Sequence, residues 1–153
     1  MHLRYVKTMS LGLLFAVGGL LYDAGQPPQV WSKDPDCTLD TLKGTYIFAP
    51  QGFQVQDGQR LPIALAGTET YDGEGHVEGQ LTQSINGEIS RVTYRGRYTI
   101  TPDCVSTETI TDSTGATSHY DQFVSPDGKE FTFIQTDPGI SLSGSERRVS
   151  KLR

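Results

Sequence analysis

The sequence predicts an all-β domain, most simply an eight-stranded antiparallel up-and-down barrel that follows an N-terminal signal segment. Two observations lead to this expectation. Turn dipeptides recur at short intervals, and the segments between them are rich in Thr, Val, Ile, Tyr and Phe, which favour strands. Within these segments apolar residues alternate with polar ones, and no segment after the N-terminal one keeps a 3.6-residue apolar period.

The first 24 residues differ in composition from the rest of the chain. Arg4 and Lys7 precede the apolar run Met9–Leu21, whose length is typical of a signal peptide and short for a membrane span. We expect residues 1–24 to be a signal peptide or a short N-terminal anchor. Residues 25–36 are Pro-rich and predict a linker, and residues 37–153 form the barrel domain. The expected location is secreted or periplasmic.

Composition limits the partners and the number of domains. A chain of 153 residues favours one domain, and a net charge of -5 argues against nucleic acid as a partner. Cys37 and Cys104 are the only cysteines, so in an oxidising compartment we expect them to form a disulfide.

Eight strands are expected between the turn signals. A helical turn at 38–43 precedes the first strand, and residues 50–60 are predicted to form a long loop between the first two strands. Closure into a barrel removes exposed strand edges, and a two-sheet sandwich is the alternative. The expected strands are about 43–49, 61–71, 76–85, 88–101, 104–112, 116–125, 129–136 and 141–149.

Small residues on several strands indicate either a ligand-sized cavity inside the barrel or simple strand bending. Of these two we favour the cavity, because an eight-stranded barrel can hold one small ligand. The residues concerned are Ala64, Ala66, Gly67, Gly79 and Gly96.

The segment from Leu39 to Tyr46 resembles the opening of lipocalins, in which a short helical turn leads into a G-x-W motif. Here Gly44 and Tyr46 take the positions of the Gly and the Trp. The resemblance implies that Arg147 or Arg148, in the last strand, packs across the Tyr46 ring. It also implies a calycin-like barrel with a cavity open at one end, and allene oxide cyclase-like barrels match equally well.

Two same-face pairs are candidates for polar contacts with a ligand. Glu69 and Tyr71 lie two residues apart at the end of one strand, and His119 and Asp121 lie two apart in another. Glu108, among alternating threonines, is expected to point outward. The expected ligand contacts are Phe53, Glu69, Tyr71 and His119, with Phe53 on a mobile lid formed by residues 50–60.

No metal-ligand spacing, phosphate-binding loop or dinucleotide motif occurs, so no metal or cofactor is expected. The predicted function is non-covalent binding of a small, mostly apolar molecule in the mouth of the barrel. Two alternatives stay open: a cofactor-free cyclase or isomerase, and a structural or interaction module of the cell envelope. The sequence leaves the oligomeric state and the catalytic residues undetermined.

Overall fold

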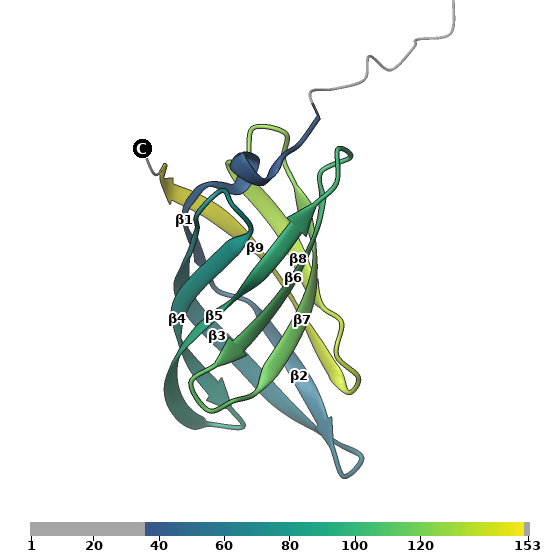
Figure 1. The fold of residues 1–153 in the computed structure, drawn as a ribbon. Coiled ribbons are helices and arrows are strands. Elements are labelled where there is room, and N and C mark those ends of the chain that lie inside the picture. Colours follow the sequence, from purple (N-terminus) through teal and green to yellow (C-terminus); the bar gives the residue numbers. More distant parts are fainter. Residues whose placement is uncertain (1–35, 152–153) are drawn as a thin grey trace, which may run out of the picture. The chain divides into compact units, whose positions relative to one another are not determined.

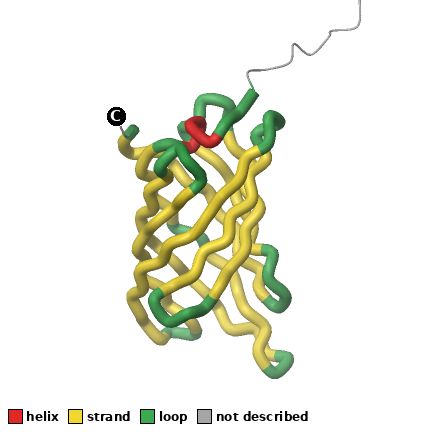
Figure 2. Tube along the Cα trace, in the orientation of Figure 1, coloured by secondary structure: helices red, strands yellow, loops and turns green. Residues whose placement is uncertain are grey.

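The computed structural model describes residues 36–151, which form a closed antiparallel β-barrel (Figures 1 and 2). The expected signal segment and residues 25–35 of the expected linker lie outside the described residues. Within residues 36–151, no helix is long and apolar enough to cross a membrane. The elements are η1 (Leu39–Leu42), β1 (Gly44–Phe48), β2 (Gln51–Gln56), β3 (Gln59–Tyr71), β4 (His76–Ile85), β5 (Glu88–Ile100), β6 (Val105–Asp112), β7 (Thr117–Val124), β8 (Glu130–Gln135) and β9 (Ile140–Ser150).

The strands follow one another around the barrel in up-and-down order, as the sequence predicted. From β3 to β9 each strand pairs with its neighbours in the chain, and β1 and β2 lie end to end between β3 and β9. These two short strands therefore count as one, and the barrel has eight strands around its circumference. The 3₁₀ helix η1 lies inside the expected helical turn.

The expected loop at residues 50–60 is wrong. Residues Gln51–Gln56 form β2, which pairs with β3 on one side and β9 on the other, and only Asp57 and Gly58 form the turn. Pro50 lies in the two-residue break between β1 and β2. Because proline has no N–H to donate, it interrupts the ladder there without ending the strand direction. The barrel therefore has no long lid in this position.

One end of the barrel is closed by η1 and by a contact between Tyr46 and Arg148. The Arg148 guanidinium lies 5.4 Å from the Tyr46 ring centroid and donates to the Tyr46 hydroxyl and the Thr41 carbonyl. The Tyr46 hydroxyl in turn donates to the Gly128 carbonyl at 2.6 Å. A register shift between Thr45 and Tyr46 places Arg148 opposite Tyr46 on β1. These contacts join η1, β1, β9 and the turn before β8.

Of the two arginines considered, Arg148 takes this position, while Arg147 is exposed on the outer face. Gly44 leaves room for the contact, since a Cβ there would meet the Arg148 side chain at 3.0 Å. Gly128 has φ 61°, and a Cβ there would overlap the Thr41 carbonyl. Glycine is therefore needed at Gly128 for both its conformation and its close packing.

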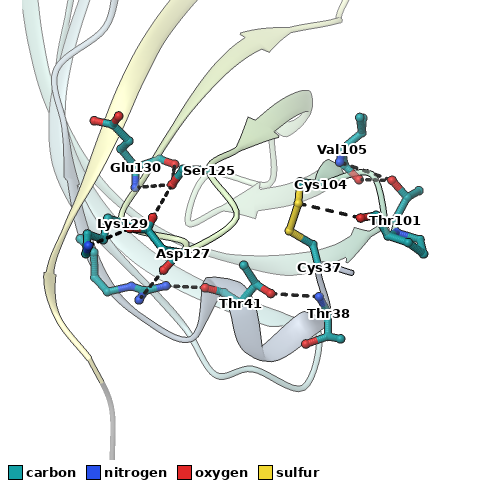
Figure 3. The surroundings of a disulfide bond; sticks show 12 residues. Cys37, Thr38, Thr41, Thr101, Cys104, Val105, Ser125, Asp127, Lys129 and Glu130 are labelled. Atoms are coloured by element: carbon teal, nitrogen blue, oxygen red, sulfur yellow. Dashed lines mark hydrogen bonds and ion pairs between the residues drawn. A yellow bond between two sulfur atoms is a disulfide. The ribbon is translucent and has the colours of Figure 1, made fainter. Parts of the chain in front are cut away.

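Cys37 and Cys104 form a disulfide beside this closed end (Figure 3). The bond links the segment before η1 to the turn between β5 and β6. The Cys37 amide also donates to the Pro102 carbonyl at 3.2 Å, and the Tyr98 hydroxyl donates to the Leu39 carbonyl. The disulfide thus ties the segment that leads into η1 to the β5–β6 turn, in addition to the contacts that Arg148 makes with η1.

We expect Arg148→Ala to lower the free energy of unfolding by about 2–3 kcal/mol, because it removes charge-assisted hydrogen bonds to partly buried acceptors. Arg147→Ala is the matched control, since it removes the same side chain from an exposed position on the same strand. That control should change stability by less than about 0.5 kcal/mol. Urea unfolding of both variants measures the difference, and equal losses would contradict the assigned role of Arg148.

Reduction of the disulfide should destabilise the protein by up to about 4 kcal/mol, because the bond closes a long loop in the unfolded chain. The two cysteines are 67 residues apart in sequence. Urea unfolding with and without a reductant measures the loss. A variant with both cysteines changed to Ser serves as the control and should not respond to the reductant; a wild-type protein equally stable in both conditions would contradict the prediction.

Candidate functional site

Three glutamates point into the barrel from three different strands, and we call them the carboxyl cluster: Glu69 on β3, Glu108 on β6 and Glu146 on β9. Their exposed fractions are 4%, 4% and 6%. Buried carboxyl groups are rare unless they are paired, because burial removes their hydration. Among the described residues, no lysine, arginine or histidine forms an ion pair with any of the three.

The register of the strands explains how the Tyr94 hydroxyl reaches Glu69. Tyr46, Glu69, Gly79 and Tyr94 lie opposite one another on β1, β3, β4 and β5. A Cβ at Gly79 would overlap the Tyr94 phenol, so glycine allows Tyr94 to lie across β4. The Tyr94 hydroxyl then reaches Glu69 Oε2 at 2.8 Å.

The hydroxyl of Tyr71 connects the rest of the network. It lies 2.5 Å from Glu69 Oε1 and 2.6 Å from Glu108 Oε2. The Gln122 amide nitrogen donates to the Tyr71 hydroxyl at 2.9 Å and to Glu108 Oε2 at 2.5 Å. Ser106 fixes the orientation of this amide by donating to Gln122 Oε1. A hydrogen bond also links the carboxyls of Glu69 and Glu146.

This geometry requires more hydrogens than the neutral donors carry. A phenol has one hydroxyl proton, so Tyr71 can donate to only one of its two carboxyl neighbours. The other carboxyl must therefore donate to the Tyr71 oxygen. Two carboxyls can share a hydrogen bond only when one is protonated, which applies to Glu69 and Glu146. The network is therefore complete when two of the three carboxyl groups are protonated and one is ionised.

The pKa shifts of the three glutamates indicate which two carry the protons. Burial, reinforced by the nearby Glu69 charge, raises the pKa of Glu108 and of Glu146 well above the usual value for a glutamate. Burial also raises the pKa of Glu69, but hydrogen bonds from Glu146, Tyr71 and Tyr94 oppose that rise. Glu69 is thus the carboxyl best suited to carry the charge, with Glu108 and Glu146 protonated.

The space beside the cluster is small. A cavity of about 30 Å³ borders all three glutamates, which is enough for a water-sized group. The expectation of a ligand-sized cavity is therefore wrong for this structure. Its other lining residues are Phe48, Pro50, Leu65, Leu81, Tyr94, Ile110, Tyr120, Gln122, Phe133 and Leu142.

Large neighbours fill the space that the small residues leave. A Cβ at Gly67 would meet the Phe48 ring at 2.7 Å, and one at Gly96 would meet Ile110. Ala64 and Ala66 are exposed, on the outer face. Pairing of large with small residues is the usual way in which a narrow barrel is packed.

The residues expected to contact a ligand divide into two groups. Glu69 and Tyr71 are buried in the interior and hydrogen-bonded to each other. His119 lies on the outer face, exposed, with its Nδ1 2.7 Å from Asp137. Phe53 is also on the outer face, and Arg60 lies over its ring. The preceding residue, Gly52, pairs with buried residues on β3 and β9 and so faces the interior, and successive residues of a strand face opposite sides.

Glu108 lies on the opposite face from the one expected, and the sequence pattern did not single out Gln122 or Glu146. Glu108 shares the parity of buried Ser106 and Ile110, and it is the intervening threonines that face solvent. That parity was the available signal. Gln122 likewise alternates with Tyr120 and Val124, whereas Glu146 stands beside two arginines in a polar stretch that suggests an outer face.

The carboxyl cluster does not form a metal centre. Within residues 36–151, no group of three His, Cys, Asp or Glu side chains is placed to hold a metal ion. The chemistry available in the interior is hydrogen bonding, charge and proton exchange.

Comparison with known proteins supports the fold. No family model and no curated protein matches the chain in sequence. Its structure is similar to that of a redesigned β-barrel, mFAP1, bound to DFHBI (TM-score 0.51, 19% identity, covering 72% of this chain and 98% of that one). It is also similar to a de novo designed fluorescence-activating β-barrel (TM-score 0.50, 20% identity, covering 72% of this chain and 95% of that one).

The cluster predicts that stability falls as pH rises from 5 to 8. A carboxyl whose pKa is raised by folding binds more protons in the folded state, so its stabilising contribution is complete below the ordinary pKa and is lost as pH rises through the raised one. Each such group contributes a slope of at most about 1.4 kcal/mol per pH unit. The described aspartates with lowered pKa titrate below this range.

Glu146→Gln isolates this effect, because the amide N–H can donate to Glu69 as the protonated carboxyl does. At pH 8 we expect the variant to be more stable than the wild type by about 1 kcal/mol or more, with the difference disappearing near pH 4.5. Glu130→Gln, on an exposed position, should keep the wild-type slope. Urea unfolding at several pH values tests this, and an unchanged slope in Glu146→Gln would contradict the protonation assigned to Glu146.

Proposed function

We propose that this protein binds a small molecule non-covalently inside its barrel and that it acts outside the cytoplasm. The observation that carries the proposal is the buried hydrogen-bonding network that borders an interior cavity. Three buried carboxyl groups lower the stability of a barrel, because burial removes their hydration, so a role in packing alone does not account for them. Perturbed ionisable groups beside a cavity are typical of ligand sites.

Two further observations support binding. The fold is shared with designed barrels, one of which holds the small molecule DFHBI. The segment Gly44–Tyr46, with Arg148 across the Tyr46 ring, resembles the lipocalin arrangement, and lipocalin-like barrels commonly bind ligands. Export is supported by the disulfide and by the signal-like composition of residues 1–24.

The residues that line the cavity indicate which kind of small molecule would bind. Leu65, Leu81 and Leu142 offer apolar contact, as expected for a mostly apolar ligand, and the carboxyl cluster adds acceptors on one side. Since the cavity is water-sized, a larger ligand must displace side chains. Leu65 and Leu81 are only partly buried and are the side chains we infer to move.

A cofactor-free isomerase or cyclase is the second candidate. The specific observation in its favour is the contact between the Tyr71 hydroxyl and the carboxyl of Glu108, since a protonated carboxyl beside a phenol can serve as a general acid. Binding that leaves the compound unchanged supports the first proposal, and conversion of a bound compound supports the second.

Native and denaturing mass spectrometry of the protein purified from its own host tests the proposal. We expect an added mass in the native spectrum that disappears on denaturation, and the same spectra show where the N-terminal segment is cut. Repeating the native measurement after denaturation and refolding gives the ligand-free control. A protein that is bare in repeated preparations, and that takes up nothing from a host extract, would contradict binding and favour a structural module.

A further inference from the structure

We propose that the carboxyl cluster recognises a primary ammonium group at the end of an apolar chain. The inference rests on the proposed binding function and specifies the class of ligand. It is carried by three observations: three buried carboxyl groups that form no ion pair among the described residues, a buried acceptor without a donor, and a water-sized cavity that borders the carboxyl groups and apolar side chains.

The first observation is the charge. Completing the network leaves one carboxyl ionised, and all of its donors within the barrel are neutral: the hydroxyls of Tyr71 and Tyr94 and the carboxyl of Glu146. Arg148, which contacts Tyr46 at the closed end, is hydrogen-bonded to Tyr46 and to the backbone there. A cation brought into the interior would balance the negative charge, and Coulomb attraction is strong where water is excluded.

The second observation is the orphaned oxygen of Glu146. Its Oε2 is buried, and among the described residues no N–H or O–H group donates to it. A buried acceptor without a donor is destabilising, because its lost hydration is not replaced. A donor placed in the adjoining cavity, from a water molecule or from the head of a ligand, satisfies this oxygen.

The third observation is the position of the cavity. It borders Glu69, Glu108 and Glu146 together and continues against Leu65, Leu81 and Leu142. A primary ammonium group is about the size of a water molecule and carries three donors and one positive charge. Its head therefore fits the cavity, and an alkyl chain attached to it takes the space that Leu65 and Leu81 leave when they move.

Other ligand heads fit less well. A carboxylate would add negative charge to a cluster that already carries one. A hydroxyl donates one hydrogen bond and leaves the charge unbalanced. A divalent metal is disfavoured because, within the part of the chain that the structure describes, no three ligating side chains are placed to hold one.

A matched set of three compounds tests the inference: hexylamine, 1-hexanol and hexanoate. They share one chain and differ in the charge and donors of the head. Binding is followed by amide NMR titration at pH 7 in 0.15 M NaCl, where salt weakens attraction to the acidic surface. We expect hexylamine to bind about tenfold or more tightly than either of the others, and the shifts to centre on β3, β6 and β9.

Glu69→Gln removes the negative charge that the network leaves on the cluster, and it should weaken hexylamine binding by about tenfold and leave hexanol binding within twofold. Glu130→Gln removes one negative charge from the outer face and should change neither. Circular dichroism verifies that both variants are folded. If Glu69→Gln does not fold, the comparison of the three compounds on the wild type still decides the question.

Two results would overturn the inference in different ways. Equal or tighter binding of hexanol or hexanoate would show an interior site that does not select a cation, and the proposed binding function would survive. Failure of all three compounds to bind would overturn the inference and, together with a bare protein in native mass spectrometry, the binding function as well. Hexylamine shifts confined to outer-face residues, and unchanged in Glu69→Gln, would also overturn it.

Discussion

A phenol has one proton, and the Tyr71 hydroxyl lies within hydrogen-bond distance of two buried carboxyl groups and an amide. The protonation of the three buried carboxyl groups depends on how that shortage is met. Glu108 must share a proton with Tyr71, Glu146 must share one with Glu69, and Glu69 can stay ionised only because three donors surround it. Protonated carboxyl groups therefore complete this interior hydrogen-bond network, with no ion pair to the three glutamates among the described residues. The stability of the barrel and the binding that we propose depend on the same groups.

The closed end makes this arrangement possible. The Tyr46 ring packs edge-on against the Tyr71 ring at 5.5 Å, and Phe131 contacts both. Arg148 and η1 cover these rings from outside, and the disulfide holds η1 in place. Water is thus excluded on one side of the carboxyl cluster, and the small cavity lies on the other side. Arg148 is hydrogen-bonded to Tyr46 and to the backbone at this end, and it forms no ion pair with the three glutamates.

Alternation and turn dipeptides were sufficient to predict the barrel, because each strand carries its own signal within about ten residues. The strand at 51–56 was not predicted, because its apolar residues Phe53 and Val55 face outward and no apolar residue of the segment faces the core. Pairing with β3 and β9 stabilises β2 instead. The pair of Glu69 and Tyr71 was predictable because the residues share one strand. Glu146 was not, since its partners come from distant strands that only closure brings together; Glu108 was misplaced because threonines on both sides suggested a polar outer surface.

The protonation of the interior glutamates is central to the predicted pH dependence of stability and to the binding that we propose. Carbon NMR of the side-chain carboxyls measures this protonation directly. The protein has seven glutamates, of which Glu74, Glu78, Glu88 and Glu130 are exposed. With ¹³C label on the glutamate carboxyl carbons, we predict that two signals, assigned to Glu108 and Glu146, remain in the protonated form at pH 7. Seven signals of ionised carboxylates at that pH would contradict this protonation.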